Sequence, residues 1–290
     1  MIILLLGCQP QASDTPKSCD QLVLFYLSKA SGNFDIYQND LAGVEKQLTN
    51  NPSWDWSPMW NPASASLIHY AYIQDTFKIC QISITSGRTA FIPGSFEEYN
   101  LSPDGQFLVS QIPVGDFSKL TILNLEDSSY WDATGADAYH GRAKWSPDAQ
   151  KIIYITDRDG NNEIYLYDML EQTNTRLTEN ETYEKYLTWA PDSRRFAYTT
   201  EYFEEGKPDR NDVFVMDLDT KEVRQITDNP YEDAEIAWSP RGDLIAFHSR
   251  RDSVDHIFTM KIDGSNVRQI TTTQTYHGEP EWGLLEPKCK

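Results

Sequence analysis

The chain has 290 residues and a net charge of −19, from 44 acidic and 25 basic side chains. Nucleic acid is therefore excluded as an expected partner, since binding to phosphates depends on Lys and Arg, and no apolar stretch reaches the roughly 18 residues that span a bilayer. The 8 Trp, 16 Tyr and 12 Phe are typical of a strand-rich protein whose sheets pack face to face.

The N-terminus carries the signal of an exported protein. Leu5-Leu6-Gly7-Cys8 follows a short apolar run and resembles the lipobox of bacterial lipoproteins. The resemblance implies that residues 1–7 are a signal segment, that Cys8 carries a lipid, and that residues 8–20 form a polar tether. No basic residue precedes the apolar run, which a start codon further upstream would explain. The other interpretation is an ordinary N-terminus in which Cys8 carries no lipid.

Trp-x-Pro motifs recur at a regular interval along the rest of the chain. The residues at the Trp position, called here the motif residues, are Trp60, Leu101, Trp145, Trp189, Trp238 and Trp282, with steps of 41, 44, 44, 49 and 44 residues between them. Leu101 replaces the Trp in its copy, and the copy that begins at Trp282 is cut off and lacks the Pro. Self-similarity with this period means that one supersecondary unit is repeated.

Each repeat contains signals for four short strands. In the copy that starts at Trp145, an apolar strand at 151–154 is followed by a turn at 157–161, a second strand at 163–165 and a last strand at 176–178 that ends in Thr. The strand that leads into the Trp makes four. Gly, Asn, Asp and Pro in the turns supply the backbone angles that hairpins need. A four-stranded sheet repeated about every 40–45 residues predicts an all-β protein built from propeller blades.

The two ends of the chain complete one blade between them. Residues 22–49 hold the last three strands of a blade but lack the opening strand, which the segment around Trp282 supplies. We therefore expect residues 21–290 to form a six-bladed β-propeller with four-stranded blades, whose ring is closed by strands from the N- and C-termini. Closure of this kind leaves no unpaired strand edge.

The motifs of the best-formed copy are similar to those of a known repeat. Trp145-Ser146-Pro147-Asp148, the turn Asp157-Arg158-Asp159-Gly160-Asn161 and the ending Arg176-Leu177-Thr178 resemble the TolB-like β-propeller repeat, a relative of WD-type repeats found in the bacterial cell envelope. The resemblance covers about residues 21–283. It implies the fold and a location in the bacterial cell envelope. Together with the lipid expected on Cys8, it predicts a protein on the periplasmic side of a bacterial membrane, or on the cell surface, that the lipid alone attaches to the membrane. It implies little about the ligand.

Three cysteines remain after Cys8. Cys19 precedes the first expected strand and Cys289 is the penultimate residue. These two positions meet where a ring closes, so we expect a Cys19–Cys289 disulfide, which would close a very long loop. Two free thiols near the termini are the alternative. Cys80 lies in an apolar alternation and is expected to be a small buried side chain.

The segment before each motif residue holds the candidate binding side chains. Five positions before the motif residues stand Asp55, Phe96, His140, Glu184, Asp233 and His277, and in three units a Tyr precedes them, namely Tyr139, Tyr183 and Tyr276. This segment enters the innermost strand of its blade, so we expect these side chains to ring one mouth of the central channel. Carboxylate, His and Tyr side chains that converge on a concave site are typical of a ligand pocket. A solvated acidic rim without a ligand is the alternative.

Two functions fit this pattern. The first is a non-catalytic, monomeric envelope propeller that needs no cofactor and binds a protein, peptide or glycan at the channel mouth. The second is a metal-dependent lyase of the oligogalacturonate type, which this class of propeller resembles and in which channel His residues hold a divalent cation. His140 and His277 are the candidates here, although their blades lie opposite each other, and Arg142 and Lys144 are the basic residues that could face an acidic sugar. No Gly-x-Ser-x-Gly nucleophile motif occurs in the sequence.

Overall fold

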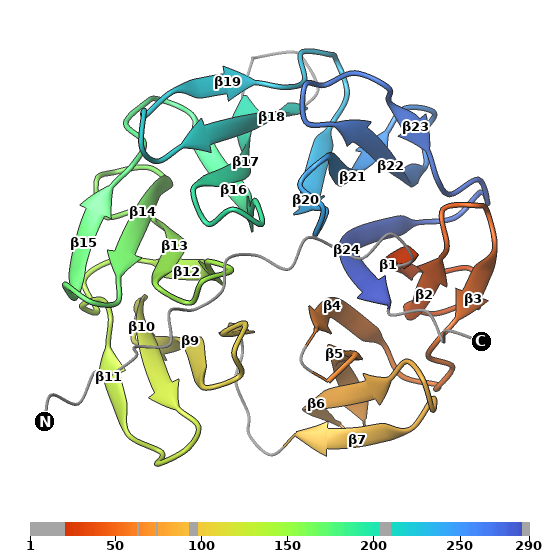
Figure 1. The fold of residues 1–290 in the computed structure, drawn as a ribbon, viewed down its shortest axis with the longest axis horizontal. Coiled ribbons are helices and arrows are strands. Elements are labelled where there is room, and N and C mark those ends of the chain that lie inside the picture. Colours follow the sequence, from red (N-terminus) through yellow and green to blue (C-terminus); the bar gives the residue numbers. More distant parts are fainter. Residues whose placement is uncertain (1–20, 63, 74, 93–97, 203–209, 286–290) are drawn as a thin grey trace, which may run out of the picture.

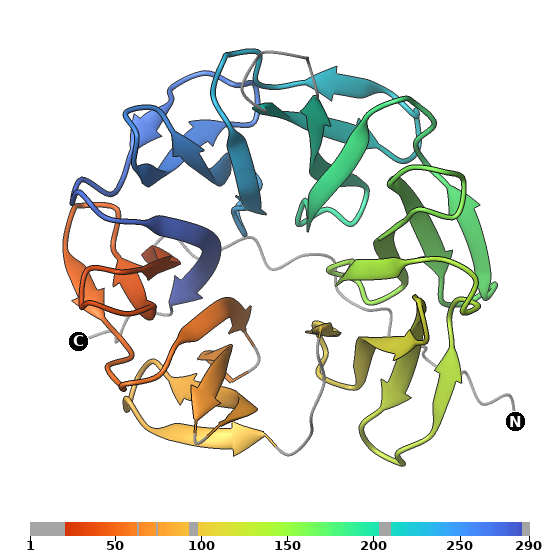
Figure 2. The ribbon, with the colours of Figure 1, turned by 180° about the vertical axis from the view of Figure 1, so that it is seen from behind.

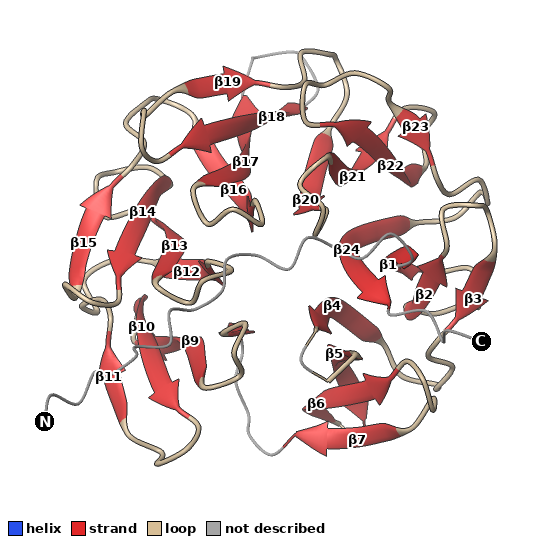
Figure 3. Ribbon diagram, viewed as in Figure 1, coloured by secondary structure: helices blue, strands red, loops and turns tan. Residues whose placement is uncertain are grey.

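The computed structural model of the protein describes residues 21–62, 64–73, 75–92, 98–202 and 210–285. Six four-stranded antiparallel sheets stand in a ring, with the innermost strands around a central channel (Figure 1). The same ring is visible from behind in Figure 2. Every regular element of these residues is a strand (Figure 3), so they contain no helix that could cross a membrane. The prediction of an all-β, six-bladed propeller is confirmed.

The strands of each blade run from the channel outward. Blade 1 contains β24 (His277–Leu285), β1 (Gln21–Ser28), β2 (Asp35–Asn39) and β3 (Glu45–Gln47). Blade 2 contains β4 (Asp55–Asn61), β5 (Ser66–Ile73), β6 (Thr76–Ser83) and β7 (Thr89–Ile92). Blade 3 contains β8 (Glu98–Leu101), β9 (Phe107–Val114), β10 (Phe117–Asn124) and β11 (Tyr130–Asp132).

The second half of the ring repeats this order. Blade 4 contains β12 (His140–Trp145), β13 (Lys151–Thr156), β14 (Glu163–Asp168) and β15 (Thr173–Arg176). Blade 5 contains β16 (Tyr183–Trp189), β17 (Arg195–Tyr202), β18 (Arg210–Asp217) and β19 (Val223–Gln225). Blade 6 contains β20 (Asp233–Trp238), β21 (Leu244–Arg250), β22 (Asp255–Lys261) and β23 (Arg268–Gln269).

The ring closes through blade 1, which takes strands from both ends of the chain. β24 pairs antiparallel with β1, from Gln21 opposite Leu285 to Ser28 opposite His277. The first and last described strands therefore hold each other in the same sheet, as predicted from the incomplete repeats at the two ends.

The Trp of each motif joins neighbouring blades. Three buried indoles donate a hydrogen bond to a backbone carbonyl of the preceding blade's innermost strand: Trp145 Nε1 to Asn100 O (3.1 Å), Trp189 Nε1 to Lys144 O (3.0 Å) and Trp282 Nε1 to Ala237 O (3.0 Å). The rings also fill the space between sheets, so these three Trp residues contribute apolar burial as well as a satisfied polar atom. Trp60 Nε1 and Trp238 Nε1 are buried without a hydrogen-bond partner among the described residues. Apolar packing is the role that all five motif Trp residues share.

The Thr at the end of each repeat closes its blade. In five blades its hydroxyl oxygen accepts a hydrogen bond from a backbone N–H of the third strand, at 2.8 to 3.0 Å, in the pairs Ile36–Thr49, Leu120–Thr134, Ile164–Thr178, Val213–Thr227 and Ile257–Thr271. These N–H groups lie beyond the end of the short fourth strand, so the hydroxyl replaces a missing ladder partner.

Several sequence predictions fall outside the described residues. They concern the signal segment, the Cys8 lipid, the tether, Phe96 and the Cys19–Cys289 disulfide. Cys80, on β6, is buried with a free thiol, in agreement with its expected role as a core side chain.

Candidate binding site in the central channel

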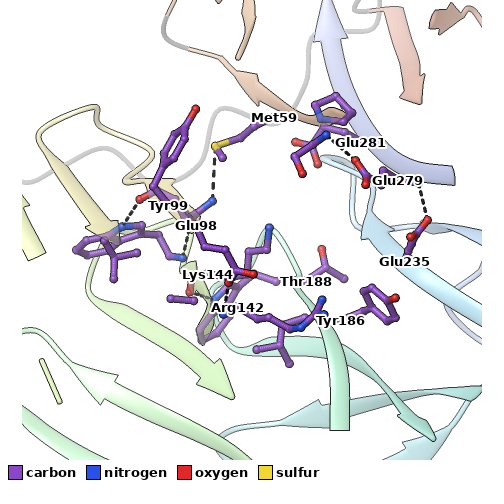
Figure 4. A pocket seen from close by; sticks show the side chains of 18 of the residues that line it. Met59, Glu98, Tyr99, Arg142, Lys144, Tyr186, Thr188, Glu235, Glu279 and Glu281 are labelled. Carbon is purple, nitrogen blue, oxygen red and sulfur yellow. Dashed lines mark hydrogen bonds between the residues drawn. The ribbon is translucent and has the colours of Figure 1, made fainter. Parts of the chain in front are cut away.

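The innermost strands line a cavity of about 520 Å³ at one end of the channel (Figure 4). Two rings of side chains surround it. The first ring lies three positions before the motif residues and consists of Ser57, Glu98, Arg142, Tyr186, Glu235 and Glu279. The second ring lies one position before them and consists of Met59, Asn100, Lys144, Thr188, Ala237 and Glu281. A cavity of this size is within the range of small-ligand sites.

A second cavity of about 320 Å³ lies beyond the second ring. Its wall includes the Pro residues of the Trp-x-Pro motifs, namely Pro62, Pro103, Pro147, Pro191 and Pro240. Met59, Asn100, Thr188 and Glu281 line both cavities. The second ring therefore divides the channel into a mouth with charged walls and a mouth with proline-rich walls.

The side chains predicted to ring the channel mouth do not lie there. Those five positions before the motif residues are fully buried and absent from the walls of both cavities: Asp55, His140, Glu184, Asp233 and His277. Their polar atoms form hydrogen bonds with other protein groups instead. Asn51, Asn180 and Asn229 each donate a side-chain hydrogen bond to the carboxylate four residues later, at 2.6 to 2.7 Å. The two His Nε2 atoms contact Asp137 Oδ1 (3.1 Å) and Thr273 Oγ1 (2.8 Å).

Burial shifts the pKa of four of these groups. It raises the pKa of Asp55 to about 6 and the pKa of Glu184 to about 7, because the charged form of a carboxyl group loses its hydration. Burial lowers the pKa of both His140 and His277. All four shifts reflect interior positions, and none requires a ligand.

A β-bulge in the innermost strand is the reason for the misplaced prediction. The register shifts between Trp56 and Met59, Gly141 and Lys144, Lys185 and Leu187, and Ala234 and Ala237. The bulged residue has a positive φ in five blades: 52° at Ser57, 53° at Arg142, 35° at Tyr186, 47° at Glu235 and 49° at Glu279. One extra residue reverses which side of a strand each side chain faces. The bulged position therefore points into the channel, and the position two residues earlier points into the blade.

The three predicted Tyr residues have different surroundings. Tyr183 is exposed on β16. Tyr139 and Tyr276 pack over Gly141 and Gly278, where an added Cβ would collide with the Tyr hydroxyl. The repeated Tyr-His-Gly sequence is thus a packing motif in which the glycine makes room for the phenol.

Side chains of the two rings connect each blade to the next. In the first ring, Glu279 Oε2 accepts a hydrogen bond from Ser57 N (2.5 Å), and Glu235 Oε2 accepts one from Glu279 N (2.7 Å). In the second ring, Glu281 Oε1 accepts a hydrogen bond from Trp60 N (3.1 Å). Asn100 Oδ1 and Thr188 Oγ1 likewise accept a hydrogen bond from the backbone N–H of the motif Trp in the next blade. These bonds hold the walls of the cavity rigid before any ligand arrives.

Glu279 and Glu281, in the wall of the cavity, have raised pKa values. Burial, reinforced by the neighbouring Glu235 charge, raises the pKa of Glu279 to about 7, and burial raises the pKa of Glu281 to about 7. The positive charge of Lys144 opposes both shifts. The Arg142 guanidinium lies over the Tyr186 ring, 5.1 Å from its centroid. Burial raises the pKa of Tyr186 to about 12.

A buried charge chain lies behind Glu235. His248, on β21, has Nδ1 3.1 Å from Glu235 Oε2 and Nε2 3.2 Å from Asp255 Oδ1, and Arg250 forms a further ion pair with Asp255 at 2.9 Å. Burial alone would lower the pKa of His248, but the two carboxylates raise it to about 10. The imidazolium in turn holds the pKa of Glu235 below its ordinary value despite burial. Glu235 is therefore the fixed negative charge of the cavity wall.

The donor set needed for a metal is not assembled in the described residues. They contain no group of three or more His, Cys, Asp or Glu side chains that could hold an ion. His140 and His277 are buried in blades 4 and 1, on opposite sides of the ring, and each contacts a residue three or four positions earlier in the chain. The residues present thus do not fit the metal site expected for a lyase.

Sequence and structure comparisons agree on the kind of propeller. The family model PD40, described as the TolB beta propeller domain, matches residues 188–286. The crystal structure of TolB from Acinetobacter baumannii superposes with a TM-score of 0.70, at 20% identity over 90% of this chain and 66% of TolB. The chain has the TolB-like propeller fold.

Other similar proteins extend this picture. A putative TolB from Agrobacterium tumefaciens superposes with a TM-score of 0.68 at 20% identity, over 89% of this TolB-like chain and 91% of that one. An oligogalacturonate lyase in complex with manganese superposes with a TM-score of 0.58 at 15% identity, over 85% of this chain and 73% of the lyase. These identities establish the fold alone. Among sequences, the uncharacterized protein Atu1656 of Agrobacterium fabrum is 28% identical over 202 residues. The match covers 63% of this chain and 63% of that relative, which is less than two thirds of its length.

The residues that face the channel were mostly missed by the sequence analysis. Only Arg142 and Lys144 were singled out there, as possible contacts for an acidic sugar, and both line the cavity. The missed acidic residues are Glu98, Glu235, Glu279 and Glu281. The signal that would have found them is the repeat itself, read one and three positions before each motif residue instead of five.

Proposed function

We propose that this TolB-like propeller is a non-catalytic binding protein of the bacterial cell envelope that holds a peptide segment of an envelope protein in its central channel. The observation that carries the proposal is the cavity of about 520 Å³, whose two rings present charged groups from rigid strands. Preformed walls reduce the ordering cost of binding. The fold shared with TolB supports the envelope setting, and lipidation at Cys8 would hold the propeller on the periplasmic side of a membrane.

The lyase alternative has less support in the site. An oligogalacturonate lyase shares the fold, and Arg142 and Lys144 line the channel as an acidic sugar would require. The expected metal ligands, however, are enclosed inside separate blades. Binding without catalysis therefore accounts for more of the observed geometry.

Capture of partners from envelope extract tests the proposal. The variant Met59→Trp enlarges a side chain of the second ring and should block the channel, whereas Val223→Trp places the same bulk on the exposed outer strand β19. We expect the protein and Val223→Trp to retain the same partner, and Met59→Trp, with an unchanged melting temperature, to lose it. Thr188→Tyr enlarges a side chain of the second ring in another blade. It should also lose the partner, which would show that the loss does not come from a folding defect of Met59→Trp.

Two outcomes would contradict the proposal. Equal capture by the channel-filled variants would place the partner elsewhere on the propeller. Capture that survives digestion of the extract with protease would identify a glycan, the other ligand class expected from the sequence, in place of a protein.

A further inference from the structure

We propose that the channel recognises a peptide segment with both a positive and a negative group, the positive group held by β20 and β24 and the negative group held by β12. This inference rests on the proposed function, because it names the chemistry of the peptide that the cavity accepts. It follows from how the charges of the two rings are divided around the channel.

One wall of the cavity is acidic. Glu279 and Glu281 stand two residues apart on β24, and Glu235 stands beside them on β20. In the described part of the chain, the blade-to-blade bonds occupy Oε2 of Glu279 and Oε1 of Glu281. The second oxygen of each carboxyl group has no such partner there, so it can accept a hydrogen bond from an ammonium or guanidinium group.

The facing wall is basic. Arg142 and Lys144 stand two residues apart on β12, in blade 4, which is three blades from blade 1 and therefore opposite it in the ring (Figure 1). Figure 4 shows Lys144 and Arg142 on one side of the cavity and Glu279 and Glu281 on the other. Neither cation forms an ion pair within 4.0 Å with any carboxylate of residues 21–62, 64–73, 75–92, 98–202 or 210–285. A ligand carboxylate would supply that missing partner.

Two neighbouring groups reduce the charge of the basic and acidic walls, but the walls keep opposite signs. Glu98, on β8, accepts a hydrogen bond from Arg142 N (3.2 Å), so one carboxylate lies on the basic side. Behind the acidic wall, the His248 imidazolium offsets part of the Glu235 charge. Glu279 and Glu281 on one side, and Lys144 on the other, remain the groups that a ligand would neutralise.

The division of charge determines which ligand is favoured. A partly buried charge is costly unless it is paired, and a ligand of a single sign would pair one wall while burying the other without compensation. A ligand with both signs satisfies both walls, provided that its charges are spaced across the channel. Complementary charge at each end also fixes the direction in which a peptide lies.

Alanine peptides with free or blocked ends test this inference by calorimetry. Free trialanine, tetraalanine and pentaalanine carry an ammonium and a carboxylate at ends about 10 to 18 Å apart when extended. N-acetylated and C-amidated forms of each remove one charge. We expect one length of the free peptide to bind about 10- to 100-fold more tightly than either blocked form, as for the loss of one charged hydrogen bond.

Variants of the two walls assign each end of the peptide. Lys144→Met should lower the affinity for the free peptide about 10- to 100-fold and leave the affinity for the C-amidated form unchanged. Glu279→Gln should lower the affinity for the free peptide by the same factor and leave the affinity for the N-acetylated form unchanged. The matched controls are Lys151→Met and Glu201→Gln, which alter ion-paired side chains away from the cavity and should change neither affinity.

The results that would overturn this inference differ from those that would overturn the proposed function. Equal affinity for free and blocked peptides would overturn the charge division while supporting peptide binding in the channel. Binding by none of the nine peptides would also overturn this inference, and the capture experiment with Met59→Trp would still decide the proposed function by itself.

Discussion

Raising the pH should destabilise the folded protein through His248 in blade 6. This buried imidazole lies between Glu235 and Asp255 at 3.1 and 3.2 Å, and their charges raise its pKa from 6.5 to about 10. Between these two values the folded protein keeps a proton that the unfolded chain has released. The free energy of unfolding therefore falls as the pH rises, because protons then favour the folded state less.

The size of the effect follows from the same two pKa values. Each pH unit across the interval removes up to about 1.4 kcal/mol from the free energy of unfolding. Over the whole interval the upper bound is about 5 kcal/mol, a large share of the stability of a typical domain. The contribution of the ion pairs is complete below pH 6.5 and is lost by about pH 10.

Denaturant unfolding at a series of pH values, on the protein and on His248→Gln, measures this contribution. We expect the difference in free energy between the two proteins to shrink steadily from pH 6.5 to pH 10. His69→Gln is the matched control, since His69 is equally enclosed but burial lowers its pKa to about 4, so its difference should stay constant over this interval. A His248→Gln difference that also stays constant would refute a buried imidazolium at this position.

Three further predictions concern packing, blade closure and ligand binding. Gly278→Ala should lower the free energy of unfolding by about 1–3 kcal/mol in denaturant titrations, because the new methyl group collides with the Tyr276 phenol and the Glu235 carboxylate; an equal cost in a Tyr276→Ala background would contradict a collision with the phenol. Thr178→Val should cost about 1–3 kcal/mol by leaving a backbone N–H of β14 unpaired, whereas the same change at the exposed Thr175 should be nearly neutral by the same measurement. Binding of the free alanine peptide whose length fits the channel should strengthen as the pH rises through about 7, where Glu279 gains its negative charge. Calorimetry should find this dependence weakened in Glu279→Gln; an identical dependence in both proteins would contradict it.

The recurrence of local signals explains why the fold could be predicted. A Trp that packs between sheets, a Pro-Asp turn and a terminal Thr each act within one blade or between neighbours, and all three recur with the same period. The incomplete copies at the two ends then imply closure, which the pairing of β1 with β24 confirms. Short-range interactions that recur with a fixed period can be recognised from a single sequence.

The direction of the channel side chains could not be predicted in the same way. Simple alternation along the strand that leads into Trp145 places His140 in the channel, yet the bulge at Arg142 turns His140 into the blade and Arg142 toward the cavity. A bulge forms only when a strand pairs with its neighbour, and its presence reverses every side chain before it. The sequence by itself therefore determined the six-bladed ring. Only the tertiary structure decided which residues meet at its centre, because that choice depends on a one-residue shift in strand pairing.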